Sequence, residues 1–266
     1  MPKTLTQFWS NLPISSGTLY VHPSDAQWFH DHGWDVQTQS STSFKRFIRS
    51  DRFQQNDQEL HPSLLPVPFV GNLERAKIFI LLMNPGFSPA NYYEEEVPAF
   101  RAACVRNLRQ LNGDDEFPFF CLNPEFAWSG GFIWWEALLR PILSKLLELK
   151  KVPSYYEALA FLAKRIAAVE LIPYHSAGGG ALNKPGKPWK NLPSAGQARS
   201  FVQRLCEAPG QPLVLVLRKH NHWELNSHAS TNCRICPALR RPTLNPDLEG
   251  ENGEAGRAIL QKLGTS

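Results

Sequence analysis

The chain has 266 residues, a length that fits one large domain or one domain with a sizeable extension. Its 42% hydrophobic and 20% charged residues are typical of an ordinary soluble globular protein, and no apolar run approaches the ~18–20 residues of a membrane span. The net charge is +4, and the five cysteines lack the spacing of a disulfide framework. With no signal peptide at the N-terminus, we expect reduced thiols and a cytoplasmic protein.

The predicted elements begin after a mixed N-terminal segment. We interpret residues 1–65 as an N-terminal extension or cap, and residues 66–266 as the main domain. In the main domain, short apolar runs alternate with segments of helical period. The runs predict buried strands at 77–83, 166–172 and 213–217, with a shorter one at 232–236. The helical segments are 98–111, 132–150 with a kink or restart at Pro141, one capped by Ser154 and Glu157, 194–206 and 253–263.

Strands that alternate with helices predict an α/β fold, because parallel strands need crossover helices that cover both faces of their sheet. We expect three α/β/α layers around a central, four-stranded, mainly parallel sheet. Ligands of such sheets bind at the carboxyl ends of the strands. The residues that follow the predicted strands are therefore the first candidates for a functional site.

Asn84-Pro85-Gly86 directly follows the first predicted strand. Asn-Pro-Gly is also a common turn. In its context, however, LLMNPGFSP resembles the first motif of the uracil-DNA glycosylase superfamily, in its mismatch-specific and single-strand-selective branches. These carry Gly-Ile-Asn-Pro-Gly or Gly-Met-Asn-Pro-Gly. The resemblance implies that the oxygen of the Asn84 amide holds the water that attacks the sugar, although Leu82 replaces the family's first glycine.

An aromatic and glycine-rich stretch, FAWSGGFIWW at 126–135, resembles the second segment of the same family, which opens a helix beside the base pocket. Aromatic faces near an extrahelical base provide stacking. Phe87 and Phe126 are the candidate stacking residues. Trp134 and Trp135 we interpret as core residues instead.

Glu170 ends the second predicted strand, at the position where the relatives have an Asn that reads the edge of uracil. An ionised carboxylate only accepts hydrogen bonds. It would be repelled by the O4 acceptor of uracil, whereas the N4 amine of cytosine donates to it. Glu170 therefore favours a cytosine-type base, with Tyr174 and His175 as further candidates for base contacts. The alternative is that Glu170 forms an ion pair with a nearby residue such as Arg165.

The segment LRRPTLNP at 239–246 resembles the family's His-Pro-Ser-Pro-Arg-Asn-Pro loop, which places a cation near the departing base. Arg240 aligns with the histidine and would stabilise an anionic base or hold a phosphate. The stretch from Lys184 to Arg241 contains ten Lys or Arg against two Glu, which suits contact with DNA phosphates, or else forms a solvated basic face. The candidate DNA-binding residues are Arg241, Lys184, Lys187, Lys190, Arg218 and Lys219.

Histidines at 220, 222 and 228 precede Cys233-x-x-Cys236, but a second pair of cysteines is missing. We expect no metal and no cofactor.

Together, the resemblance implies a monomeric, monofunctional DNA glycosylase that acts on double-stranded DNA, has no membrane partner and leaves an abasic site. Glu170 and the Gly178–Gly180 loop favour a bulky modified cytosine. The lead-in at 68–72 joined to LLMNPGF also resembles anti-phage glycosylases that remove α-glucosylated hydroxymethylcytosine from viral DNA. Three alternatives stay open: repair of uracil or deaminated bases, a catalytically inactive DNA-binding or sensing module, and an unrelated α/β enzyme that acts on nucleotides.

Overall fold

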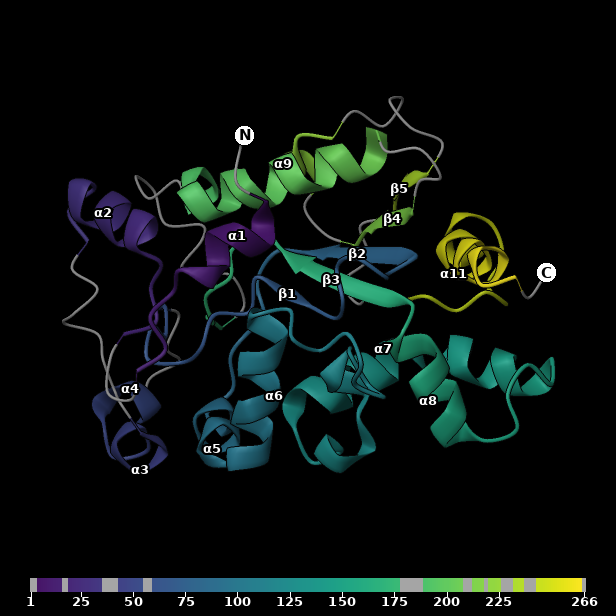
Figure 1. Ribbon diagram of the computed structural model, residues 1–266, viewed down its shortest axis with the longest axis horizontal. Helices are drawn as coiled ribbons and strands as arrows, with labels where there is room; N and C mark the ends of the chain where they lie inside the picture. Colours follow the sequence, from purple (N-terminus) through teal and green to yellow (C-terminus); the bar gives the residue numbers. More distant parts are fainter. Residues whose placement is uncertain are drawn as a thin grey trace. The chain divides into compact units, whose positions relative to one another are not determined.

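The protein has a mixed α/β fold around a five-stranded sheet in the order β1-β3-β2-β4-β5 (Figure 1). The computed structural model describes residues 4–15, 19–34, 43–54, 59–177, 189–207, 212–217, 220–225, 232–236 and 243–264. The strands are β1 (Phe69–Val70), β2 (Ile78–Leu82), β3 (Ile166–Glu170), β4 (Leu213–Val216) and β5 (Cys233–Ile235). The α/β class is confirmed. The expected number of four strands is wrong, because the proline-rich lead-in adds the two-residue strand β1.

The strands β2, β4 and β5 are parallel. β2 pairs with β4 so that Ile78 lies opposite Leu213, and β4 pairs with β5 so that Val214 lies opposite Cys233. Every residue of β2, β3 and β4 is buried. Apart from Glu170, these strands are continuously apolar, as a sheet covered on both faces requires.

Eleven α-helices are assigned in the described parts of the chain. The N-terminal ones are α1 (Leu5–Ser10), α2 (Pro23–Asp31), α3 (Phe44–Phe47) and α4 (Asp51–Gln54). The others are α5 (Ala90–Glu96), α6 (Pro98–Leu108), α7 (Gly130–Glu148), α8 (Tyr155–Ala163), α9 (Pro193–Glu207), α10 (His220–Trp223) and α11 (Glu251–Lys262). Short 3-10 turns occupy Phe120–Leu122, Pro124–Phe126 and Trp189–Asn191.

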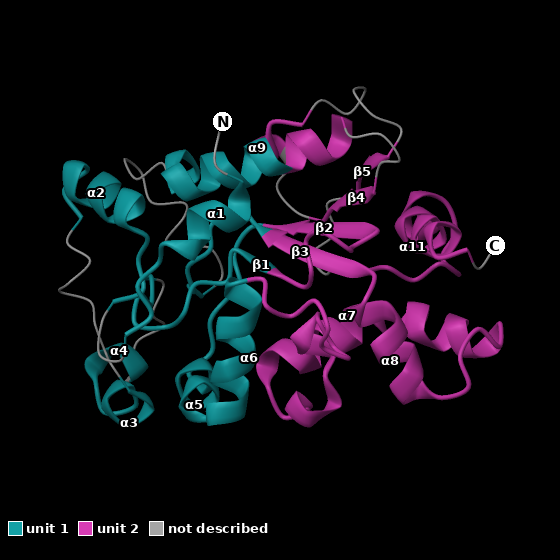
Figure 2. Ribbon diagram, in the orientation of Figure 1, with its two compact units in different colours: residues 1–69, 83–109, 170–201 teal, residues 70–82, 110–169, 202–266 magenta. Residues whose placement is uncertain are grey.

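The chain divides into two compact units, coloured separately in Figure 2. Unit 1 comprises residues 1–69, 83–109 and 170–201, and unit 2 comprises 70–82, 110–169 and 202–266. Nearly all of the sheet belongs to unit 2. The loops that leave the carboxyl ends of β2 and β3 belong to unit 1, together with the N-terminal residues.

Within unit 2, α7 and α8 lie on one side of the sheet and the C-terminal part of α9 on the other (Figure 2). α7 continues through Pro141 as one helix, so of the two expectations for this proline the restart is wrong and the kink stays a prediction. Proline removes one helical N–H donor. The side chains of Leu138, Leu139 and Ile142 around it are buried, and their packing stabilises the uninterrupted helix.

An aromatic cluster forms the interior of unit 1. The Phe29 ring lies 4.3 Å from Trp34 and 5.6 Å from Trp189, measured between ring centroids. Tyr174, in the loop after β3, packs against the same cluster from 6.1 Å. The first helices are thus part of the core around that loop.

Candidate active site

Two loops of unit 1 meet where β2 and β3 end. The first carries Asn84 to Phe87, and the second carries Tyr174 to Ser176. The backbone N–H of Ile172 donates to the carbonyl of Met83 at 2.8 Å, which joins the loops just beyond the two strands. This edge is where the sequence predicts a site, and the structure brings Asn84, Phe87 and His175 together there.

The side-chain amide of Asn84 has a defined orientation. Its Nδ2 donates to the backbone carbonyl of Ser176 at 3.0 Å and lies 3.1 Å from the Ser176 hydroxyl. A carbonyl oxygen only accepts, so the NH2 group must face Ser176 and the Oδ1 acceptor must face away. Asn84 is partly buried, which leaves part of the residue accessible from outside. We call these contacts the Asn84–Ser176 network.

His175 supports this turn from the interior. Its Nδ1 lies 3.0 Å from the carbonyl of Gly86 and donates to it. Burial lowers the pKa of His175 to about 4, although the carbonyls of Gly86 and Leu65 oppose the shift. The imidazole is therefore neutral near pH 7 and fixes the conformation of the Asn84–Gly86 turn. This favours a positioning role for His175 over the expected contact with a base.

Phe87, a predicted stacking residue, is partly buried and stacks in parallel on His61, with 3.5 Å between the ring centroids and 9° between the planes. The backbone N–H of His61 donates to the carbonyl of His175 at 2.9 Å, and Leu60 forms an antiparallel bridge with Ser176. His61 lies in the predicted N-terminal extension, and the sequence pattern gave no signal that it joins this site. We call the two rings the His61–Phe87 stack.

Tyr174 is only 1% exposed, and its hydroxyl donates to Oδ2 of Asp25 at 2.6 Å. Asp25 is fully buried in α2, and its other oxygen accepts from the backbone N–H of Ser194 at 2.9 Å. Burial raises the pKa of Asp25. The backbone N–H of His22 completes this Tyr174–Asp25 network by donating to the Tyr174 hydroxyl at 3.2 Å. In this conformation Tyr174 is a core residue, and its contact with a base stays a prediction.

Glu170, the last residue of β3, is buried. Its backbone N–H donates to the carbonyl of Pro68 at 3.0 Å. The alternative partner, Arg165, lies in unit 2, where its guanidinium donates to the carbonyl of Phe161 and lies 3.6 Å from the centroid of that ring. These contacts account for Arg165 without a carboxylate.

The aromatic segment resembling the family's second motif belongs to unit 2. Phe126 is 5% exposed and packed in the interior in this conformation, so its stacking on a base stays a prediction. Trp135 is buried as expected, whereas Trp134 is 40% exposed. The assignment of Trp134 to the core is therefore wrong. Ser129 caps the helix that these residues open by accepting from the N–H of Phe132 at 3.1 Å.

Most of the predicted DNA contacts fall outside the described residues: Arg240, Arg241, Lys184, Lys187, Arg218 and Lys219, together with the Gly178–Gly180 loop. Lys190 is described, and it is exposed at the turn before α9.

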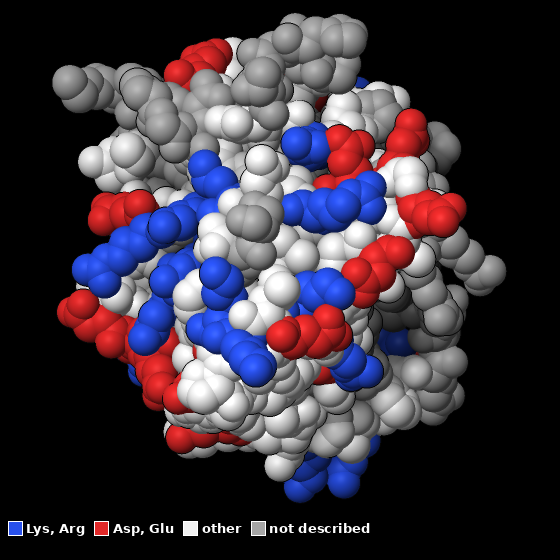
Figure 3. All heavy atoms as spheres, turned by 90° about the vertical axis from the view of Figure 1, so that its right-hand side faces the viewer, with Lys and Arg blue, Asp and Glu red and all other residues white. Residues whose placement is uncertain are grey.

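Figure 3 shows the side of Figure 1 that carries α8 and α11, where Lys and Arg lie among Asp and Glu. Lys145, for example, contacts Glu148 at 2.9 Å and Asp247 at 3.1 Å. Charges on this face are mixed rather than uniformly basic.

In the described portion of the chain, no group of three or more His, Cys, Asp or Glu side chains is arranged to hold a metal ion. Cys233 and Cys236 belong to this portion, and Cys233 contacts Cys206. His228 lies outside it.

Comparisons with protein-family models, with curated proteins and with solved structures find no match to this chain. Among the helices of the described residues, none combines the length and the apolar character needed to span a bilayer. The geometry of the loops after β2 and β3 is therefore the basis for the function proposed next.

Proposed function

We propose that this protein is a monofunctional DNA glycosylase that hydrolyses the N-glycosidic bond of a flipped, modified base. The orientation of the Asn84 amide carries the proposal. The Ser176 carbonyl holds the NH2 group, so the acceptor Oδ1 is directed away from that carbonyl. A fixed acceptor is what is needed to hold a water molecule by one of its protons while the water oxygen faces a substrate.

In the proposed reaction, the water oxygen forms a bond to C1′ of the sugar, and the bond between C1′ and the base nitrogen breaks. The base departs with the electron pair of that bond, and the attacking water loses a proton to solvent. Base departure runs ahead of water attack, so the sugar becomes oxocarbenium-like and a placed neutral water is a sufficient nucleophile. Asn84 acts by position and not as a strong base, which fits an amide side chain.

The proposed substrate is a modified cytosine, with glucosylated hydroxymethylcytosine of phage DNA as the specific candidate. Glu170, the last residue of β3, is our candidate for reading the base, because a carboxylate accepts from the exocyclic N4 amine of cytosine and repels the O4 of uracil. The His61–Phe87 stack supports a stacking role for Phe87, since one face of its ring is already fixed.

The test is an assay of base release. Duplex oligonucleotides that contain uracil, cytosine or glucosylated hydroxymethylcytosine are incubated with the protein, cleaved at abasic sites with alkali and analysed by mass spectrometry for free base. We expect release of the modified cytosine alone. Release of uracil alone would replace the modified-cytosine proposal with uracil repair.

Asn84→Ala tests the site itself. We expect the rate of base release to fall by about 10²–10³-fold, the size of effect seen when one oriented catalytic amide is removed, while DNA binding persists. The matched control is Asn91→Ala, an Asn seven residues along the chain whose side chain contacts the backbone of Ser88 and the Glu94 carboxylate. If wild type and Asn84→Ala bind DNA equally well and neither releases a base, the protein is a binding module instead.

A further inference from the structure

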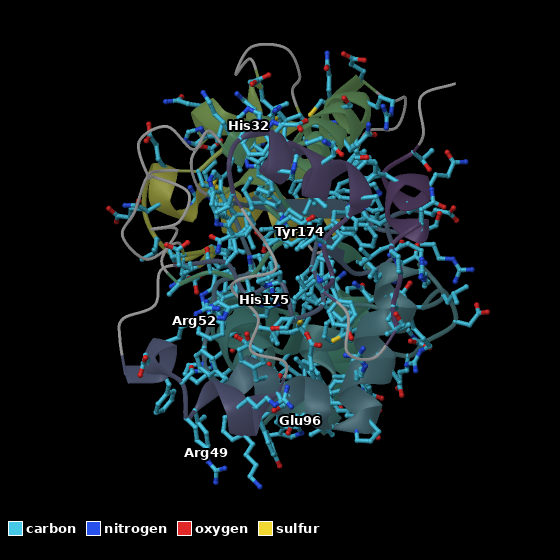
Figure 4. The ribbon with its side chains drawn as sticks, turned by 90° about the vertical axis from the view of Figure 1, so that its left-hand side faces the viewer. His32, Arg49, Arg52, Glu96, Tyr174 and His175 are labelled. Carbon is cyan, nitrogen blue, oxygen red and sulfur yellow. The ribbon has the colours of Figure 1, made fainter. Side chains whose placement is uncertain are left out.

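Two cysteines of unit 2 are in contact although they are far apart in the sequence. Cys206 lies in the last turn of α9, Cys233 begins β5, and a hydrogen bond joins their side chains. Figure 2 shows the end of α9 beside β5. Both residues are free thiols. Tyr174 and His175, which are labelled in Figure 4, belong to unit 1 with the rest of the candidate active site.

The sheet excludes the cysteine that is nearest to Cys233 in the sequence as its partner. Cys233 lies opposite Val214 in the parallel pair of β4 and β5, and the backbone N–H of Cys236 donates to the carbonyl of Val216 at 3.0 Å. The chain is therefore extended from Cys233 to Cys236. Three residues of extended chain span about 10 Å, and their end side chains point to opposite faces. A disulfide needs Cα atoms within about 7 Å, so Cys206 is the partner of Cys233 and Cys236 is not.

The contact makes the two thiols chemically different. The Cys206 S–H donates to the Cys233 sulfur and stabilises a thiolate there, so this hydrogen bond lowers the pKa of Cys233 and raises that of Cys206. Burial and the neighbouring Cys236 oppose the lowering at Cys233. Cys233 is partly exposed, whereas Cys206 is buried. An accessible thiolate with a second thiol beside it is the arrangement of a cysteine that reacts with oxidants and is then resolved to a disulfide.

We propose that Cys206 and Cys233 form a redox-active dithiol, which hydrogen peroxide oxidises to a disulfide, with Cys233 as the attacking sulfur. In the first step the Cys233 sulfur bonds to one peroxide oxygen, the O–O bond breaks and hydroxide leaves, so that Cys233 becomes a sulfenic acid. In the second step the Cys206 sulfur bonds to the Cys233 sulfur and the S–O bond breaks. The departing hydroxide takes the Cys206 proton and leaves as water. In total the two thiols lose two electrons and two protons, and the peroxide becomes two molecules of water.

The disulfide joins α9 to the edge of the sheet. β5 is the last strand in the sheet order, and its three residues are all partly exposed. The new bond closes a loop that contains all of β4, which restricts the unfolded chain more than the folded one. Because the two side chains are already in contact, the bond needs little movement of either element. We therefore expect oxidation to stabilise the protein, and a dithiol reductant to reverse the effect.

The test follows the thiols of the full chain and involves no DNA, so its outcome is independent of the proposed function. Wild type, Cys206→Ser, Cys233→Ser and the control Cys236→Ser are treated with hydrogen peroxide, alkylated and mapped by mass spectrometry. Cys236 is the matched control because it lies three residues from Cys233 and burial raises its pKa to about 12. We expect wild type and Cys236→Ser to lose two thiols and to yield the Cys206–Cys233 disulfide, which dithiothreitol reduces.

The other two variants separate the steps. Cys206→Ser should accumulate a sulfenic acid at Cys233, which dimedone traps, and Cys233→Ser should form neither product. A Cys233–Cys236 disulfide, or the absence of any disulfide in folded wild type, overturns the proposal. Oxidation of Cys206 in Cys233→Ser at the wild-type rate overturns it as well, because Cys233 would then not be the attacking sulfur. The first two results are read from wild type and do not depend on how well a variant folds.

Two further measurements test the geometry. At pH 7 the alkylation rate of Cys233 should be several-fold lower in Cys206→Ala than in Cys206→Ser, because serine keeps a hydrogen-bond donor beside the Cys233 sulfur. Equal rates would overturn the role of Cys206 in activating Cys233. Oxidation should raise the Tm of wild type by about 5 °C or more and leave that of Cys206→Ser unchanged. A Tm of wild type that falls on oxidation would overturn the preformed pair, since the disulfide would then require a rearranged structure.

Discussion

The loop after β3 takes part in two hydrogen-bonded networks of unit 1 that differ in what surrounds them. In the Tyr174–Asp25 network, the carboxylate and the hydroxyl are both buried and bonded to partners from the interior. In the Asn84–Ser176 network, the residue is partly buried, and among the described residues the side-chain contacts of Asn84 are those of its NH2 group with Ser176. The first therefore contributes to stability, whereas the second is the one that we propose to act on a substrate.

Replacing Asp25 with Ala should have the largest effect on stability. The substitution leaves the Tyr174 hydroxyl and the Ser194 N–H without their buried acceptor, which we expect to lower the free energy of unfolding by about 3 kcal/mol. Chemical denaturation measures this change. Asp31→Ala, at the exposed end of the same helix, is the control and should have little effect. Equal destabilisation by both variants would contradict the structural assignment of Asp25.

The pH dependence of stability should have opposite signs in the two regions. Because the folded-state pKa of His175 is about 4, the native state binds fewer protons than the unfolded state between that value and the usual 6.5. The contribution of His175 is thus complete above pH 6.5 and is lost as the pH falls toward 4, by up to about 1.4 kcal/mol per pH unit. Asp25 has a raised pKa, so its contribution is lost as the pH rises above 3.8.

Denaturation of wild type and His175→Gln at several pH values checks the sign. The stability difference between the two should shrink on acidification from pH 6.5 to 4. A difference that grows on acidification would mean that His175 is protonated in the folded protein.

Tyr174→Phe should destabilise the protein by about 2 kcal/mol, because it removes two buried hydrogen bonds, one to Asp25 and one from the N–H of His22, and keeps the ring. Base release should be unchanged, since the hydroxyl faces Asp25. A large loss of base release at unchanged stability would return Tyr174 to the candidate base-contact residues.

Ser176→Ala should give the smallest effect. It removes the hydroxyl beside Asn84 Nδ2 but keeps the backbone carbonyl that fixes the amide. We therefore expect base release to fall only a few-fold, which corresponds to less than about 1.4 kcal/mol, with stability unchanged. A loss as large as that of Asn84→Ala would show that the hydroxyl, and not the carbonyl, orients the amide.

The strands could be predicted from the sequence, since buried parallel strands are short apolar runs bounded by turn residues. The run at 77–83 contains β2, and the turn after it carries Asn84. Placing Asn84 at a strand end thus needs only local information. The two-residue strand β1 has no such pattern, because Pro68 and Gly71 on either side suggest a loop.

The partners of Asn84 could not be predicted in the same way. Ser176 is 92 residues away along the chain, and His61, which stacks on Phe87 of the same loop, comes from a segment without recognisable periodicity. Their contacts depend on tertiary packing around Tyr92 and Phe87. Exposure of neighbouring residues in α7 is equally hard to foresee, as the adjacent Trp134 and Trp135 show.

The bond from Asn84 to Ser176 also constrains the order of folding. Contacts between residues 92 positions apart require a large loop to close, and the entropy of closure must be overcome before the contact stabilises anything. A chain synthesised from its N-terminus can form α1 to α6 before Ser176 has left the ribosome. The oriented amide is therefore acquired late during synthesis, after the helices that surround it.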